Sequence, residues 1–498
     1  MSGEGPRDDP RPAVGADPRR LHPLTVLLEA GRVLGRVLWF FVVLMVVGSL
    51  GGRRADPGTW LFVLAGSGTL VALARYLSLR YSVEGGTLVI RSGIVARQVR
   101  TIPLDKVQNV ELRQNAVHQL AGVVDFRIET AAGPQAEANL AVLSVEAARR
   151  LKAEIFAGRS DAAGQDAAPS PVVVWKAGLS DLLILGATSN RAGAILGALA
   201  GLFLFLGLEL PRYLAALQEG LFEILGVVSP ALAAAVFVGA TLLLGWVLSI
   251  GLTVVRSFGF QLTREPDGRL RRRYGLLSRV ETIVNPARIQ LLQVGSPLLR
   301  RRLGYWEVAA HTAGAALDGD AAGSALLCPL LRKGDLAGFC RRLRPGLDVN
   351  AVDWRPVSRA ALRRGFIRYL VLSLVAAGAA AAALGPWAFS SLLPLVPAAW
   401  LLARRRYRVL AHARQGGHFL ARSGVLHRRI TVVPESKVQW VGLEQNPFQR
   451  RLGIASLTAA TAAGAAHVVD LDAAEASALQ AALSGAASAA GAWLPDAV

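Results

Sequence analysis

The sequence has little of several residue types, and each shortage narrows the class of protein. Cysteine occurs twice, at Cys328 and Cys340, so no disulfide framework holds the fold. The seven histidines are scattered, and none stands in an H-E-x-x-H or cysteine-rich metal pattern. The sequence also lacks a P-loop, a G-x-G-x-x-G after a strand and a G-x-S-x-G elbow. We therefore expect no catalytic residues, no cofactor and no metal, and a protein that is not an enzyme.

Acidic residues are also scarce. Asp and Glu number 35 against 55 Lys and Arg, which gives a formal net charge of +20. Hydrophobic residues make up 53% of the chain and the mean hydropathy is +0.40. This combination is typical of membrane spans with a basic side that faces anionic lipid. Aromatic residues do not interleave with the basic runs as base-stacking platforms would, so we expect no nucleic-acid partner.

Apolar runs come in three pairs, and each run approaches the ~20 residues that a membrane span needs. They cover residues 33–50, 60–79, 192–210, 231–255, 366–384 and 387–403. Three hairpins place the amino terminus and the segment after each hairpin on one side. Arginines gather on that side, among them Arg363, Arg364, Arg368, Arg404, Arg405, Arg406 and Arg408. The positive-inside rule predicts that this side is cytoplasmic, in a multi-pass protein of the cell membrane. The spans contain almost no charge, which weighs against a secondary transporter.

One stretch of about 40 residues occurs three times, which marks an internal repeat. Its copies are Ser92–Gly133, Tyr274–Gly314 and Ser423–Gly464. A glycine heads each copy, and a Gln 15 residues on, a Gly 29 on and a Thr 37 on recur in all three without a gap. These landmarks are Gly93, Gly275 and Gly424, then Gln108, Gln290 and Gln439, then Gly122, Gly304 and Gly453, then Thr130, Thr312 and Thr461. Each copy follows one pair of apolar runs, so the larger unit is a hairpin plus a domain.

Each copy reads as short β-strands followed by one helix. Runs of β-branched and apolar residues are bounded by Pro, Gly, Asn or Gln. The heading glycine lies between two such runs, where a tight hairpin needs positive φ. The helices are expected over about Ser144–Phe156, through Leu336, Phe339, Cys340 and Leu343 on one face, and after Asp472. Cysteine on that face indicates core packing.

The order of motifs resembles bacterial pleckstrin-homology (PH) domain membrane proteins of the YdbS/YdbT type. The third copy carries the resemblance best, through Val433, Pro434, Lys437, Val438, Gln439, Gln449, Arg450, Arg451, Leu452 and Gly453. The resemblance implies partly open PH-like β-barrels with a capping helix, and no settled biochemical activity. Copy two has Asn285 where the others have Pro103 and Pro434, and copy one has Gln119 and Leu120 in place of the Arg pair.

These observations predict a multi-domain α+β membrane protein with six transmembrane helices in three hairpins, each followed by a PH-like domain. The expected order is a disordered tail (1–30), hairpin 1 (31–80), PH-like domain 1 (81–158), a linker and interfacial segment (159–190), hairpin 2 (191–255), PH-like domain 2 (256–345), a juxtamembrane segment with hairpin 3 (346–403), PH-like domain 3 (404–485) and a tail (486–498). Within the linker region, residues 172–187 are expected to lie along the membrane surface.

Basic positions of the repeat are the candidate anion-facing or lipid-facing residues. They are Lys106, Arg288, Lys437, Arg301, Arg302, Arg450 and Arg451. The alternative is that they are ordinary positive-inside anchors and solvated faces. Gly193, Gly197 and Gly201 form a double G-x-x-x-G that suits close helix packing, although small residues are frequent in such spans anyway. His412 and His418 flank an expected hairpin turn, where a solvated turn is favoured over a metal site.

The function that this pattern favours is a non-enzymatic membrane-anchored scaffold or binding protein. Its three PH-like domains would face partner proteins or lipid headgroups, and its expected partners are membrane lipids and another membrane protein or a second copy of itself. The alternative is a component of membrane transport, of lipid handling, or of envelope-stress and antimicrobial-peptide resistance.

Overall fold

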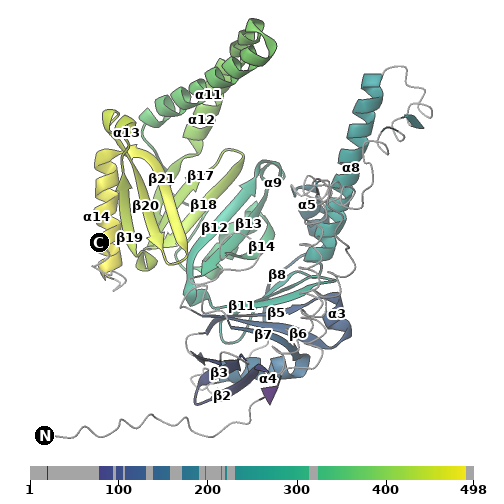
Figure 1. The fold of residues 1–498 in the computed structure, drawn as a ribbon. Coiled ribbons are helices and arrows are strands. Elements are labelled where there is room, and N and C mark those ends of the chain that lie inside the picture. Colours follow the sequence, from purple (N-terminus) through teal and green to yellow (C-terminus); the bar gives the residue numbers. More distant parts are fainter. Residues whose placement is uncertain are drawn as a thin grey trace, which may run out of the picture.

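The protein is seen in a computed structural model. It describes residues 19–20, 78–93, 97–104, 107–130, 138–157, 171–189, 230–312 and 324–489, with the single positions 197, 215, 219 and 220. Every strand pair in these ranges is antiparallel, and the strands form four sheets (Figure 1).

The two outer sheets are small. The first has the order β1-β2-β3-β4 and contains β1 (Arg19–Arg20), β2 (Arg80–Glu84), β3 (Thr87–Ser92) and β4 (Gln98–Pro103). The last has the order β19-β20-β21 and contains β19 (Trp440–Glu444), β20 (Ile454–Thr461) and β21 (Gly464–Asp472).

The two inner sheets have seven strands each. One has the order β7-β6-β5-β11-β10-β9-β8 and contains β5 (Val107–Gln114), β6 (Val123–Thr130), β7 (Ala138–Ser144), β8 (Val172–Lys176), β9 (Gln261–Arg264), β10 (Leu270–Tyr274) and β11 (Arg279–Val284). The other has the order β14-β13-β12-β18-β17-β16-β15 and contains β12 (Ile289–Pro297), β13 (Tyr305–Thr312), β14 (Ser324–Arg332), β15 (Arg355–Pro356), β16 (Ala411–Gln415), β17 (His418–Ser423) and β18 (His427–Pro434).

Each repeat supplies four strands to one sheet and three strands plus a helix to the next. We call β1–β7 with α4 (Val145–Ala157) domain 1, β8–β14 with α10 (Lys333–Leu343) domain 2, and β15–β21 with α14 (Ala473–Ala489) domain 3. The core of each domain lies between its two half-sheets and its helix. On α10 the expected face, Leu336, Phe339, Cys340 and Leu343, is buried, so that prediction is confirmed, and both cysteines are buried core residues.

The inner sheets join neighbouring domains. At junction 1, β5 of domain 1 pairs with β11 of domain 2, and at junction 2, β12 of domain 2 pairs with β18 of domain 3. Gln114 lies opposite Arg279 at junction 1, and Ser296 lies opposite Arg428 at junction 2. Counted from the heading glycine of each repeat, these are the same two positions. The three domains are therefore joined edge to edge in one row, in one register.

The heading glycine is required by the hairpin that it closes. Gly275 has φ +104° and Gly424 has φ +86°, in the region that side-chain-bearing residues rarely adopt. A Cβ on Gly275 would lie 1.9 Å from the Ser278 carbonyl oxygen, and one on Gly424 would lie 1.8 Å from that of His427. The expected positive-φ hairpin is confirmed, and this turn delivers β11 and β18 to their junctions.

A strand that precedes each hairpin was missed by the sequence reasoning. β1, β8 and β15 pair with β2, β9 and β16, the first strands after the hairpins. The expected disordered tail therefore contains a strand at Arg19–Arg20. The structure also shows how the segment 172–187 folds, while its place along the membrane surface stays a prediction. Its first part is β8 in a sheet, and its second part, α5 (Leu179–Ala187), packs against α8 (Pro230–Ser257).

Three described helices are long and apolar enough to cross a membrane. They are Val238–Ser257 within α8, Ala360–Leu384 (α11), and Pro386–Val409, which comprises the 3-10 helix η4 (Pro386–Ser391) and α12 (Leu392–Val409). They correspond to the fourth, fifth and sixth expected spans. The first three fall outside the described residues, apart from isolated positions, so the count of six stays a prediction. In Figure 1 the α11–α12 hairpin extends from domain 3 and α8 extends from domain 2.

Candidate anion site at the base of the membrane helices

A short helix follows the first strand of each three-stranded half-sheet. These helices are α3 (Ala116–Leu120), α9 (Leu298–Arg302) and α13 (Pro447–Arg451). In α13, the Asn446 side chain accepts a hydrogen bond from the main-chain N–H of Gln449 at 2.8 Å. The Gln449 side chain in turn accepts one from the main-chain N–H of Asn446 at 3.1 Å. This capping box, with Pro447 at the first helical position, starts the helix. Gly453, with φ +64°, follows its end.

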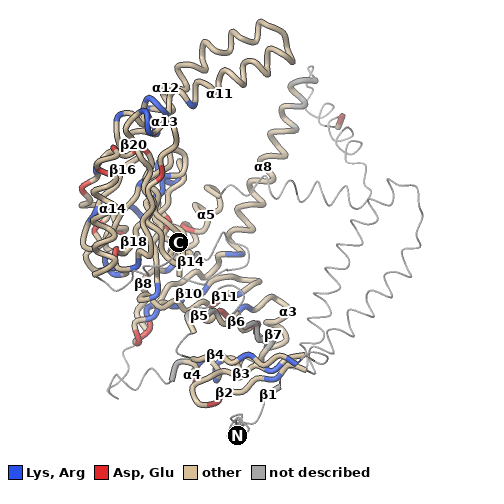
Figure 2. Tube along the Cα trace, turned by 60° about the vertical axis from the view of Figure 1, so that its left-hand side comes forward, with Lys and Arg blue, Asp and Glu red and all other residues tan. Residues whose placement is uncertain are grey.

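α13 lies beside the base of the α11–α12 hairpin (Figure 1). Between them is a pocket of about 640 Å³. Its charged lining consists of Arg363, Arg364, Arg368, Arg406, Arg451 and Asp470. Basic residues gather where the hairpin meets the domain (Figure 2). We call this the domain 3 pocket.

Asp470 fixes the hairpin to the domain. It lies at an irregularity of the β20–β21 pairing, is 5% exposed, and has φ +61°. Its carboxylate accepts a bond from the Gln449 side chain at 3.0 Å and pairs with Arg364 of α11. Because a buried carboxylate needs such partners, this contact orients the base of α11 against α13.

After that pairing, the domain 3 pocket keeps a positive excess. Asp470 is the one acid among its described lining residues, and it is bound to Arg364. Within the described residues, Arg363, Arg368 and Arg451 are exposed and form no ion pair with an acid, while Arg406 is half-buried. Arginine presents a planar fork of donors that suits phosphate and carboxylate groups. The arrangement can therefore bind an anion at the base of the membrane helices.

Domain 2 has a counterpart in the same place. A pocket of about 600 Å³ lies between α9, α5 and the end of α8, and its charged residues include Arg256, Arg272, Arg300 and Glu307. Arg300 donates to Glu307 at 2.7 Å and to the Thr188 hydroxyl at 2.9 Å. Arg272 donates to the Leu326 carbonyl at 2.8 Å. Two of these arginines are therefore held by groups of the protein itself.

The repeated Arg pair does not act as one unit. Arg451 lines the domain 3 pocket, and Arg450 is exposed beside it on α13. Arg301 donates to the Val425 carbonyl at 3.0 Å, across junction 2. Arg302 is exposed on α9. Arg301 is therefore occupied as a junction residue.

The other basic position predicted from the repeat, Arg288 in copy two and Lys437 in copy three, does not line either pocket. Arg288 and Lys437 belong to the 3-10 turns η3 (Pro286–Arg288) and η5 (Glu435–Lys437), which precede β12 and β19. The short helices follow the far ends of those strands, so the two sets of basic residues lie at opposite ends of each domain. Lys106 lies outside the described residues. Of the glycine motif only Gly197 is described, in a helix, while Gly193 and Gly201 are not, so the packing prediction stays untested.

The sequence suggests a solvated turn at His412 and His418, but both histidines, beside the β16–β17 turn, are buried. His412 is 1% exposed and His418 is 6% exposed. Burial lowers the pKa of both imidazoles, and for His412 this outweighs the nearby Glu475 carboxylate. Within the described residues, no group of three or more His, Cys, Asp or Glu is placed to hold a metal.

The sequence does not single out Asp470 or four arginines of the domain 3 pocket as site residues. These arginines, Arg363, Arg364, Arg368 and Arg406, indicate membrane topology alone in the sequence. Their signal is positional, because they flank the hairpin whose domain carries the best-matching Arg pair. Membrane orientation and anion binding both favour positive charge at the end of a span. The residue types alone therefore do not distinguish an arginine that orients the span from one that binds an anion.

The fold and its repetition define the class of this protein. The chain belongs to the bacterial PH domain family, whose model matches residues 33–159, 194–344 and 362–487. It is a membrane protein with three such repeats. It is similar to the UPF0699 transmembrane protein YdbT of Bacillus subtilis (strain 168), with 24% identity over 464 residues, which cover 88% of this chain and 91% of that protein. The resemblance expected from the motifs is confirmed. No solved structure matches the chain.

Proposed function

We propose that this protein is a non-enzymatic scaffold anchored in the cell membrane, whose row of PH domains is held at the cytoplasmic surface by anionic lipid headgroups. The domain 3 pocket is the observation that carries this proposal, because five arginines and one acid line a space of about 640 Å³ where a hairpin enters the domain. The positive-inside distribution of arginines supports the cytoplasmic orientation.

The row itself supports the scaffold role. Both junctions continue a sheet from one domain into the next, so the domains keep fixed positions relative to one another. A fixed row at the membrane surface suits the presentation of several faces at set spacings.

The headgroup site is tested by lipid titration of the full-length protein in neutral detergent, with bound lipids counted by native mass spectrometry. Phosphatidylglycerol should bind more tightly than phosphatidylcholine. Replacing Arg363, Arg368 and Arg451 by Gln should weaken phosphatidylglycerol binding roughly 100-fold, since each basic residue near an anionic surface contributes about 1 kcal/mol.

A matched control removes the same charge elsewhere. Arg150, Arg341 and Arg342 are exposed on α4 and α10, and their replacement by Gln should leave phosphatidylglycerol affinity within about twofold. Equal losses from the two triple variants, or no preference for the anionic lipid, would show that the domain 3 pocket is not a headgroup site.

A further inference from the structure

Two strands at opposite ends of the row have an edge that no described strand covers. β4 is the outer strand of the first sheet, and β19 is the outer strand of the last. By position in the repeat, β4 corresponds to β11 and β18, while β19 corresponds to β5 and β12. β4 therefore lacks the kind of partner that β5 and β12 provide, and β19 lacks the kind that β11 and β18 provide. A single chain therefore carries both strand edges that a third junction would need, and these two edges do not meet within the chain.

Side-chain exposure at the two edges matches this vacancy. Val99 on β4 is 62% exposed, whereas Ile430, at the same repeat position in β18, is 5% exposed. Trp440 on β19 is 52% exposed, whereas Leu291, at the same position in β12, is 4% exposed. An open strand edge with exposed hydrophobic side chains is a site for pairing with another chain.

We propose that β19 of one copy pairs with β4 of a second copy, head to tail, in the register of the internal junctions. That register places Leu443 opposite Val99 and Trp440 opposite Ile102, by position in the repeat. Because this contact joins two different surfaces of identical chains, each copy can bind a further copy at either end, and successive copies form a ring or an open row in the membrane.

The internal junctions show how the exposed side chains would be buried. At junction 2, Ile430 of domain 3 enters the core of domain 2, and Leu291 of domain 2 enters the core of domain 3. By the same exchange, Val99 enters the core of the second copy's domain 3 beside Leu443. Trp440 enters the core of domain 1 beside Ile102. The pairing therefore buries both exposed side chains.

A hydrogen bond made by helix α14 differs from its counterpart in α4, and the difference fits the absence of a strand beside β19. Gln480 lies at the helical position that Lys152 has in α4, counted from the first helical residue. Lys152 reaches across junction 1 to Glu281 of the docked strand β11, at 2.8 Å. Gln480, with no docked strand to reach, donates to the Val441 carbonyl of β19 at 3.2 Å. An incoming β4 would take the place of this side-chain bond.

The second copy is the occupant that the chain itself specifies. Both complementary edges are present in one sequence, and the register comes from two junctions of that same sequence. Membrane anchoring confines copies to a plane with one orientation, which raises their effective concentration. This inference does not depend on lipid binding, because neither edge includes a residue of the domain 3 pocket.

Cross-linking in membranes tests the pairing. Val99→Cys and Leu443→Cys are produced with different tags in the same cells, and their membranes are treated with a short bis-maleimide. The native Cys328 and Cys340 are buried and stay in place. The proposal expects a covalent dimer that carries both tags, and no dimer from either variant alone. A chain that carries both substitutions should give a ladder of dimers, trimers and longer species.

The control shifts the register by one residue. Arg100→Cys with Leu443→Cys places the thiols on opposite faces of the sheet. The yield of cross-linked dimer should therefore fall about tenfold relative to the matched pair. Adding Trp440→Asp to the matched pair should also abolish the dimer while the protein still elutes as a single folded species. Three results would overturn the proposal: no two-tag dimer, dimers from a single variant alone, or cross-links to a different membrane protein in place of a second copy.

Discussion

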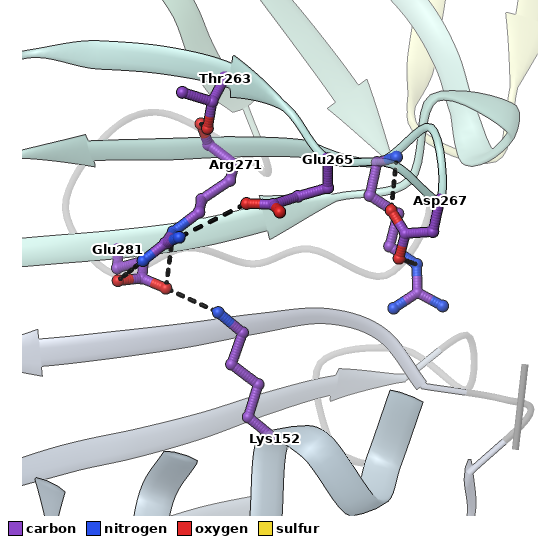
Figure 3. A network of polar contacts seen from close by, with 7 residues as sticks. Lys152, Thr263, Glu265, Asp267, Arg271 and Glu281 are labelled. Carbon is purple, nitrogen blue, oxygen red and sulfur yellow. Dashed lines mark hydrogen bonds and ion pairs between the residues drawn. The ribbon is translucent and has the colours of Figure 1, made fainter. Parts of the chain in front are cut away.

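Junctions 1 and 2 share one backbone register but are held by different side chains. At junction 1, Lys152 of domain 1 pairs with Glu281 of domain 2 at 2.8 Å, and Arg271 contacts the same carboxylate at 3.1 Å (Figure 3). At junction 2, the position of Glu281 is taken by Ile430, which is buried with Val432 in the core of domain 2. The repeat therefore fixes which strand edges meet, while the side chains there vary between ionic and apolar contact.

The largest expected effect comes from placing a charge in the apolar junction. Ile430→Asp buries a carboxylate with no cation provided for it, and we expect a loss of about 3–5 kcal/mol in the free energy of unfolding. Thermal unfolding of the detergent-solubilised protein measures it. Val99→Asp in the detergent-solubilised monomer is the matched control, because Val99 has the same repeat position but is exposed on a single copy. If the two variants unfold alike, burial at junction 2 does not stabilise the row.

The ionic junction should depend on salt, unlike the apolar one. Burial raises the pKa of the Glu281 carboxyl, but Lys152 and Arg271 outweigh this and hold that pKa below its ordinary value. Lys152→Met should therefore destabilise junction 1 by about 1 kcal/mol, because the pair is partly screened by solvent. Hydrogen exchange of β5 amides measures the change, and 1 M salt should produce a similar one in the parent protein, as expected for a screening length of about 3 Å.

Arg150→Met, on the exposed side of the same helix, is the control for that exchange experiment. It should leave β5 protected. Faster exchange of β12 amides in high salt would remove the distinction between the two junctions.

Each junction is bridged by one side chain from the same position of the repeat. Gln119 donates to the Leu276 and Leu277 carbonyls at 3.2 and 3.0 Å, and Arg301 donates to the Val425 carbonyl at 3.0 Å. An amide and a guanidinium serve equally here because the acceptor is a neutral main-chain carbonyl. We expect Arg301→Gln to cost less than about 0.5 kcal/mol and Arg301→Ala about 1 kcal/mol, read from thermal unfolding. A larger cost for the Gln variant would show that the Arg301 charge matters.

The repeats and their glycine turns could be predicted because both are written locally in the sequence. The turn at Gly275 does not depend on which domain lies beside it, and the apolar residues of α10 recur with helical spacing. Strand pairing between domains has no such local signal. Val99, Glu281 and Ile430 occupy one repeat position, and only the neighbouring strand decides whether that position is exposed, ionic or apolar.

The candidate site was predictable only in part for a related reason. Arg451 and Arg301 occupy nearly the same place in the repeat, yet one lines a pocket and the other bridges a junction. What separates them is the hairpin base beside α13 and the following domain beside α9. Both are contacts with distant segments, which a repeat motif does not record.

The smallest expected effect separates the junctions by pH. Beside junction 2, burial lowers the pKa of His427 from its ordinary 6.5, Glu307 at 3.5 Å raises it, and nearby arginines lower it further. A lowered histidine pKa stabilises the fold above pH 6.5, and that contribution is lost as the pH falls through the folded-state value. The lowered pKa of Glu281 stabilises junction 1 above its ordinary 4.5 and is lost only in stronger acid.

Hydrogen exchange over a pH series should therefore show β18 losing protection before β5 as the pH falls from 7.5. The buried histidines His412 and His418 belong to the same sheet and have lowered pKa values, so they contribute in the same direction. His427→Gln leaves both of them in place and should move the loss of protection in β18 to lower pH, because one of the three groups that take up a proton on unfolding is gone. If β18 opens at the same pH with and without His427, that imidazole does not stabilise junction 2, and the difference between the junctions lies in the apolar contact of Ile430 alone.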